Sequence, residues 1–201
     1  MGTIYVLVGI YCTAAIVILI ALYKVAVGYR NTKFWRANGV TNFPVKYKGK
    51  TFWHSRSVAV AGFVFARNTE GKWCVLANKR GKGTPDFQGY WCCPCGYLDY
   101  NETAQEAIAR ECNEECGIII EPNQFEMMSV DTSPQANRQN VTIMHRVVCY
   151  DKVADDFVFS TANMEKDEVD EIKFIPLDEA KKYQWAFGHF KLIKELSEGL
   201  E

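Results

Sequence analysis

Three glutamates, Glu111, Glu114 and Glu115, stand in one short segment of the chain, beside a single cation, Arg110. Ionised carboxylates this close repel one another, and burying them adds a further cost unless a counter-charge is present. A hard divalent cation such as Mg²⁺ takes carboxylate oxygens and water as its ligands. The cluster therefore indicates metal-dependent chemistry. The alternatives are an exposed acidic patch, or pairing with lysines and arginines from elsewhere in the chain.

A helix over residues 104–116 is predicted to carry these glutamates. Thr103 and Glu106 have the spacing of a capping box, in which each side chain accepts a hydrogen bond from the other residue's backbone N–H. Gly117 follows at the position where a left-handed residue ends many helices. Both ends of the helix are thus marked in the sequence itself.

Two of the glutamates fall on the face of the helix that is otherwise small and apolar, where charged side chains are unusual. On a wheel that starts at Ala104 and advances about 100° per residue, the small and apolar side chains cover an arc from about 300° to about 140°. Glu111, at about 340°, and Glu115, at about 20°, fall inside the arc, and Glu114 lies at its edge. Each buried carboxylate costs several kcal/mol unless a counter-charge is present.

The chain around this helix has the pattern of one mixed α/β domain. Strands are predicted at 58–65, at 73–78 after a turn at 68–71, over the alternating segment 141–150, and at 172–175. Glycines and a proline mark 80–89 as a loop, and the residues from 178 onward are predicted to be helical, with 190–196 the last helical stretch. Together these elements indicate a sheet between helices.

The composition, 48% hydrophobic and 23% charged with 6 prolines in 201 residues, excludes a disordered or collagen-like chain. The net charge of −1 conceals an asymmetry, because no Asp or Glu precedes Glu70. The first 69 residues carry +9 and the remaining 132 carry −10. The two parts of the chain therefore have opposite electrostatic character.

Residues 4–23 form an uncharged, largely apolar run of twenty residues, enough to span a hydrocarbon core of about 30 Å as a helix. All the basic residues follow this run, so we expect a single-pass transmembrane helix with the bulk of the chain on the cytoplasmic side. A buried core helix is the alternative. Residues 24–50 are predicted to be a basic juxtamembrane connector that suits an anionic leaflet, and the domain itself is expected over 51–201. A nucleic-acid patch would look similar to the connector and is not favoured.

The chain has 8 cysteines. In a reducing cytoplasm, structural disulfides are rare. Cys92-x-x-Cys95 and Cys112-x-x-x-Cys116 would suit a zinc site only with further ligands, but the three histidines are scattered. Small buried free thiols are therefore expected.

One longer pattern joins these features. Residues 96–118 resemble the Nudix box, Gx5Ex7REUxEExGU. Five residues separate Gly96 from Glu102, seven separate Glu102 from Arg110, and the segment 110–118 supplies the rest of the box. Cys112 stands where an aliphatic residue is more usual. The preceding segment 89–96 resembles the family's Gly-x-Trp-x-x-Pro-Gly-Gly, with Cys95 replacing the first of the paired glycines.

This resemblance implies a Nudix-type α/β/α sandwich with a mixed sheet, and a hydrolase that cleaves a nucleoside diphosphate linked to a group X. Mg²⁺ is the cofactor it implies, with Mn²⁺ as an alternative. By position, Glu111, Glu114 and Glu115 would be metal ligands, with the carbonyl of Cys95 as an extra one. Arg110 and Glu102 would brace the loop and orient the acidic residues. Many relatives dimerise, which leaves a homodimer open.

The family's general base is either a box glutamate or an acid on a later loop. Glu168 is favoured here, followed by Glu165, and the alternative for both is an ordinary solvated loop. Lys79 and Arg80 are candidate phosphate contacts. Pro134, sixteen residues beyond the box, resembles a feature of ADP-ribose pyrophosphatases.

ADP-ribose, hydrolysed to AMP and ribose 5-phosphate, is therefore the expected substrate. Cleavage of an NTP to NMP and diphosphate is the enzymatic alternative. A binding module that senses a nucleotide without hydrolysing it belongs to another class.

Overall fold

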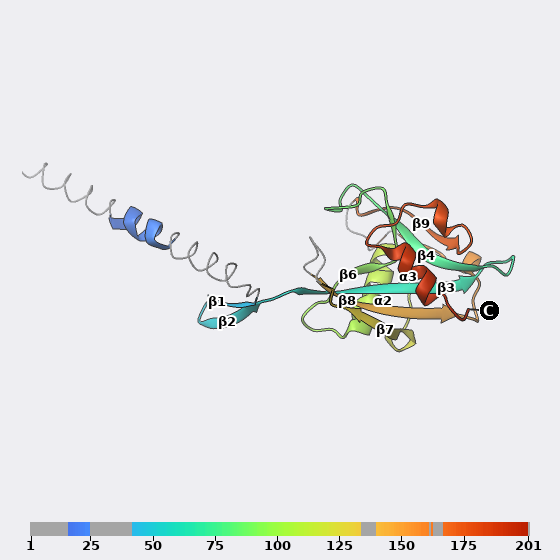
Figure 1. The fold of residues 1–201 in the computed structure, drawn as a ribbon, viewed down its shortest axis with the longest axis horizontal. Helices are drawn as coiled ribbons and strands as arrows, with labels where there is room; N and C mark the ends of the chain where they lie inside the picture. Colours follow the sequence, from blue (N-terminus) through green and yellow to red (C-terminus); the bar gives the residue numbers. More distant parts are fainter. Residues whose placement is uncertain (1–15, 25–41, 134–139, 161, 163–166, 201) are drawn as a thin grey trace, which may run out of the picture. The chain divides into compact units, whose positions relative to one another are not determined.

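We describe a computed structural model of the chain, in which residues 16–24, 42–133, 140–160, 162 and 167–200 are placed (Figure 1). The chain divides into two compact units, Met1–Arg56 and Ser57–Glu201. Each unit is described by itself.

The first unit contains a helix and a hairpin. Residues 16–24 are helical and exposed, whereas residues 4–15 of the predicted membrane span lie outside the described part. No helix among the described residues combines the length and the apolar character needed to cross a bilayer. Strands β1 (Phe43–Tyr47) and β2 (Lys50–His54) pair in antiparallel fashion.

The sequence pattern did not predict this hairpin. The predicted connector contains β1, and the predicted domain start at residue 51 falls inside β2, whereas the structure divides after Arg56. The tight turn places Lys48 and Gly49 at φ values of 47° and 77°, a conformation that glycine adopts without strain. Mixed basic and aromatic side chains in two short strands give no clean alternation, which is why the hairpin was missed.

The second unit is built on one mixed sheet. Its strands are β3 (Ser57–Arg67), β4 (Trp73–Arg80), β5 (Trp91–Cys92), β6 (Cys95–Tyr97), β7 (Glu126–Asp131), β8 (Asn140–Cys149) and β9 (Val169–Pro176). The order is β5-β4-β3-β8-β7, with β6 also paired to β3 and β9 to β4. Strands β3 and β8 run parallel, and the other pairings between named strands are antiparallel.

A helix covers each face of this sheet (Figure 1). Helix α2 (Ala104–Cys116) packs Ile108 and its apolar neighbours against Val60 and Val64 of β3. Helix α3 (His189–Leu196) packs Ile193 and Leu196 into the cluster that contains Phe63. Because successive side chains of a strand point to opposite faces, β3 supplies both clusters. The predicted α/β sandwich with a mixed sheet is confirmed.

Candidate active site

Helix α2 begins and ends where its sequence signals predict. The Thr103 hydroxyl accepts from the backbone N–H of Glu106, whose side chain in turn accepts from the backbone N–H of Thr103 at 2.7 Å. Gly117 ends the helix in the left-handed region, at φ 67°. The helix is therefore fixed at both ends, and so is the direction in which its glutamates point.

The predicted burial of two carboxylates is confirmed. Glu111 is 9% exposed and Glu115 4% exposed, while the Glu114 side chain is 42% exposed. Burial raises the pKa of Glu111 to about 7, although the neighbouring Arg110 acts in the opposite direction. Burial likewise raises the pKa of Glu115 well above its usual range. Both groups would ionise more readily if a further cation were bound beside them.

Arg110 holds the acidic cluster together. Its guanidinium donates to both oxygens of Glu102, at 3.0 and 2.8 Å, and to the carbonyl of Tyr97 at 2.9 Å. Its Nη1 also donates to Glu111 and Glu114, at 2.8 and 2.9 Å. The hydrogen bond from Arg110 lowers the pKa of Glu102. The bracing role predicted for Arg110 and Glu102 thus has a direct geometric basis.

Glu115 has a separate set of partners. Its Oε2 accepts from the backbone N–H of Cys95 at 3.0 Å and from the side-chain amide of Asn78 at 2.9 Å. Sequence reasoning expected the carbonyl of Cys95 at this site and missed Asn78. The available signal was an asparagine directly after the apolar run 74–77 of β4, in a position that is still buried.

Gly96 lies against the carboxylate of Glu111. A Cβ atom at this position would overlap the Glu111 carboxyl group. The first glycine of the box is therefore required by close packing, and its φ angle is not in the left-handed region.

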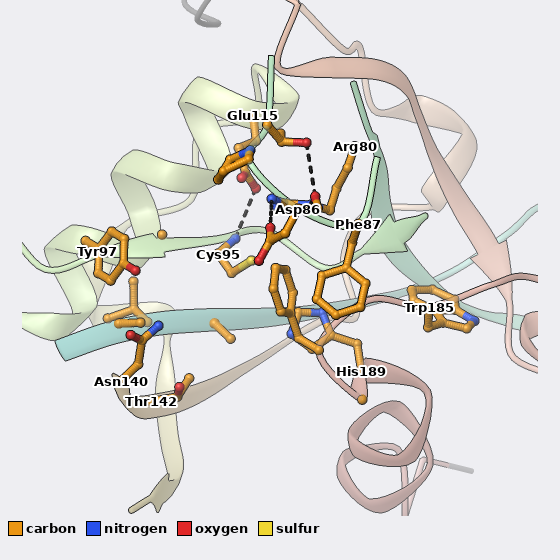
Figure 2. Close-up of a pocket in the computed structure, with 18 of the residues that line it drawn as sticks. Arg80, Asp86, Phe87, Cys95, Tyr97, Glu115, Asn140, Thr142, Trp185 and His189 are labelled. Atoms are coloured by element: carbon orange, nitrogen blue, oxygen red, sulfur yellow. Dashed lines mark hydrogen bonds and ion pairs between the residues drawn. The ribbon is translucent and has the colours of Figure 1, made fainter. Parts of the chain in front are cut away.

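A cavity of about 950 Å³ opens beside the acidic helix, within the size range of small-molecule sites. Figure 2 shows Glu115 and Cys95 at one side of it and the rings of Phe87 and Trp185 toward another. The cavity therefore joins an acidic wall to an aromatic one.

Two aromatic residues of the cavity have strained backbones. Phe87 and Phe187 have φ angles of 50° and 56°. Their rings pack edge to face, with 5.0 Å between the ring centroids. Bulky residues seldom adopt this region, and such strain clusters at functional sites. The guanidinium of Arg80 lies 4.8 Å from the centre of the Phe187 ring and is held by Asp86 at 2.8 Å.

The two candidate phosphate contacts, Lys79 and Arg80, differ in their position relative to the cavity. Arg80 lines the cavity, whereas Lys79 is not among the lining residues that the structure describes. Both lie on strand β4 rather than on the loop that the sequence predicted.

Of the loop acids, Glu168 lines the cavity and its carbonyl accepts from the N–H of Gly81 at 2.7 Å. Glu165 and Pro134 lie outside the described residues. His189, which sequence reasoning also missed, lines the same cavity, and its Nδ1 accepts from the N–H of Cys93 at 3.0 Å.

The donor set agrees in type with a hard divalent cation, because the buried side chains on this wall are carboxylates. Arg110 contacts Glu111 and Glu114 but has no hydrogen bond or ion pair to Glu115. Within the described ranges, no three acidic, histidine or cysteine side chains already form a metal cage. Glu111 and Glu115 therefore fit a metal by chemistry and burial.

The seven described cysteines are free thiols, as predicted. Burial raises the pKa of Cys93 and Cys112 well above the usual range, so neither is a ready thiolate ligand.

Comparison with known proteins agrees with this geometry. Residues 56–196 match the NUDIX domain. An ADP-ribose pyrophosphatase from Methanocaldococcus jannaschii is 30% identical over 139 residues, covering 69% of this chain and 72% of that protein.

Two solved structures share the fold. The NUDIX domain of Shewanella oneidensis NrtR, solved with ADP ribose, has a TM-score of 0.58 at 20% identity, covering 73% of this chain and 90% of that one. A MutT/nudix family protein from Enterococcus faecalis has a TM-score of 0.56 at 20% identity, covering 82% and 67%. At such identities these two structures support the fold alone. The domain match, the pyrophosphatase relative and the braced acidic helix lead to one conclusion: the chain belongs to the Nudix hydrolase family.

Proposed function

We propose that this Nudix pyrophosphatase hydrolyses the diphosphate of a nucleoside diphosphate linked to X, with ADP-ribose as its substrate. The observation that carries the proposal is the pair of buried carboxylates, Glu111 and Glu115, on the helix beside a nucleotide-sized cavity. The relative from M. jannaschii bears the name of this activity. The products would be AMP and ribose 5-phosphate.

The two walls of the cavity suit the two ends of such a substrate. The rings of Phe87 and Phe187 offer stacking surfaces for a base. Arg80 brings a cation to the same cavity for a phosphate oxygen.

Glu111, Glu114 and Glu115 would hold the divalent cation. A bound Mg²⁺ would screen the negative diphosphate and orient the attacking water. Arg110 keeps Glu111 and Glu114 in place through Nη1. Glu168, which also lines the cavity, would accept the proton of water as the water attacks phosphorus and the bridging P–O bond breaks.

The competing readings predict different products. An NTP pyrophosphatase would release NMP and diphosphate, and a nucleotide sensor would bind without turnover. The intact acidic set favours hydrolysis over sensing, because a sensor has no use for buried carboxylates that are costly to ionise.

The test incubates the chain, purified in detergent, with Mg²⁺ and a panel of ADP-ribose, NADH, diadenosine polyphosphates, sugar nucleotides and NTPs. Phosphorus NMR identifies the products. Glu115→Gln should abolish turnover, while Glu198→Gln, a matched change at an exposed site, should not. Tight binding of one nucleotide without product would place the protein among sensors instead.

We also propose that residues 4–23 anchor the enzyme in a membrane, with the catalytic unit on the cytoplasmic side. The uncharged run and the nine basic residues that follow it, before any acid, support this. In the described hairpin, Val45, Tyr47 and Phe52 are exposed beside lysines, as suits an anionic surface. Alkaline extraction of cell membranes should leave the full chain in the pellet and release a chain that lacks residues 1–24. Release of both would refute the anchor.

A further inference from the structure

Asn78 is buried near the end of strand β4, where its side chain has hydrogen-bond partners on helix α2 and on strand β5. The residue is 1% exposed. Its Nδ2 donates to Oε2 of Glu115 at 2.9 Å, across 37 residues of sequence. Its Oδ1 accepts from the thiol of Cys92 at 3.0 Å, where β5 pairs with β4.

The two contacts fix the orientation of the amide. The buried Cys92 side chain is a thiol, whose S–H can donate, and Glu115 offers only acceptors when ionised. A flipped Asn78 amide would set its NH₂ group against the thiol and its carbonyl against the carboxylate. The arrangement with both ends satisfied is therefore strongly preferred, because unsatisfied polar groups are costly in the core.

Glu115 is held through a single oxygen. Oε2 receives the hydrogens of Asn78 and of the Cys95 backbone, at 2.9 and 3.0 Å. No hydrogen bond from any described residue reaches Oε1. Since Glu115 lines the cavity, Oε1 is the oxygen left for a cation or a water molecule.

We propose that Asn78, itself oriented by the Cys92 thiol, is a positioning residue that fixes Glu115 so that Oε1 is its working oxygen. This inference rests on the proposed hydrolase function. It assigns Cys92 and Asn78 a role in catalysis that neither the box nor its spacing implies. The competing explanation is that both side chains merely satisfy one another in the core.

The first test replaces the amide by an apolar side chain of similar size, Asn78→Leu, in the full chain. Loss of a partner behind a metal ligand typically costs about 10–100-fold in metal affinity or activity. We expect kcat and the affinity for Mn²⁺, measured by electron paramagnetic resonance, to fall by about that factor while KM stays within about twofold. Val75→Ala, a core truncation on the same strand, should lower the melting temperature and leave kcat and Mn²⁺ affinity unchanged.

The second test probes the thiol. Cys92→Ala should lower Mn²⁺ affinity in the same direction as Asn78→Leu, and Cys92→Ser, which keeps a donor, should restore it. Cys93→Ala removes a neighbouring, equally buried thiol and should have no effect. If the two residues act in series, the Asn78→Leu, Cys92→Ala double variant should be no worse than Asn78→Leu alone.

A third measurement needs neither metal nor turnover. In the metal-free protein, the side-chain amide protons of Asn78 should exchange slowly with solvent, and faster in Cys92→Ala than in Cys93→Ala.

These outcomes distinguish failure of the proposed function from failure of the positioning proposal. Absence of any nucleotide hydrolysis by the unaltered chain defeats the proposed function, whereas wild-type Mn²⁺ affinity in Asn78→Leu, with only a lower melting temperature, overturns the positioning role. A chain that binds no Mn²⁺ at all also overturns it.

Discussion

Removing the guanidinium of Arg110 should destabilise the domain by an amount that depends on pH. In Arg110→Leu, Glu111 loses its only ion-pair partner among the described residues, while Glu102 and Glu114 lose theirs at the same guanidinium. Breaking a buried pair costs about 3–5 kcal/mol. Because the Arg110 side chain is 29% exposed, we expect the lower end, about 3 kcal/mol at pH 8.

The pH dependence follows from Glu111. Its pKa in the folded protein is raised to about 7, above the usual 4.5. A carboxyl group with a raised pKa contributes stability that is complete below 4.5 and is lost as the pH rises through about 7. At pH 5.5 Glu111 is mostly protonated when folded, so its pair with Arg110 contributes little. The cost of Arg110→Leu should then fall to about 1–2 kcal/mol, which is the loss of the more exposed bonds to Glu102, Glu114 and the Tyr97 carbonyl.

The assay is urea unfolding of the fragment 57–201, which contains every described residue of the hydrophobic core, in EDTA at pH 5.5 and pH 8. Lys191→Leu provides a matched control, because Lys191 and Glu195 form an exposed pair worth less than about 1 kcal/mol at either pH. Equal destabilisation by Arg110→Leu at both pH values would show that Arg110 does not compensate the buried charge of Glu111.

Three further changes have distinct expected results. Glu115→Gln should lower turnover at least about 100-fold at saturating Mg²⁺ and leave the melting temperature the same or higher, since it replaces a carboxyl group that is costly to ionise in the core by a neutral side chain of the same shape. Phosphorus NMR measures turnover and calorimetry the melting temperature, and unchanged turnover would refute the ligand role. Gly96→Ala should lower both the melting temperature and Mn²⁺ affinity, because the new methyl group overlaps Glu111; wild-type values for both would contradict the close packing. Phe187→Ala should raise KM for the nucleotide about tenfold at nearly constant kcat in steady-state assays, since it removes a stacking surface; a lower kcat at constant KM would contradict base stacking.

The sequence predicted the acidic helix well because its determinants are local. The capping box, the glycine that follows and the wheel positions of Glu111 and Glu115 all depend on residues within one short segment, and the structure confirms each. The partners of these residues are different in kind. Asn78 lies 37 residues from Glu115, and His189 lies 96 residues from Cys93, so only the pairing of strands and the docking of α3 reveal their contacts.

The position of Arg80 shows how a local pattern can mislead. Glycines and a proline in 80–89 predict a loop that includes Arg80, yet β4 continues through Arg80 by pairing with β9. The register shifts between Lys79 and Arg80, and such bulges redirect side chains. The N–H of Gly81 then donates to the carbonyl of Glu168 at 2.7 Å, which ties this loop to the start of β9.

The contact between Gly81 and Glu168 affects which charged side chains line the cavity. The same backbone contact brings Arg80, at the end of β4, and Glu168, directly before β9, to the cavity that Glu115 of α2 also lines. Arg80 pairs with Asp86, and its guanidinium lies over the Phe187 ring. The presence of Arg80 and Glu168 at one cavity therefore follows from the pairing of β4 with β9, which a box motif elsewhere in the chain could not encode.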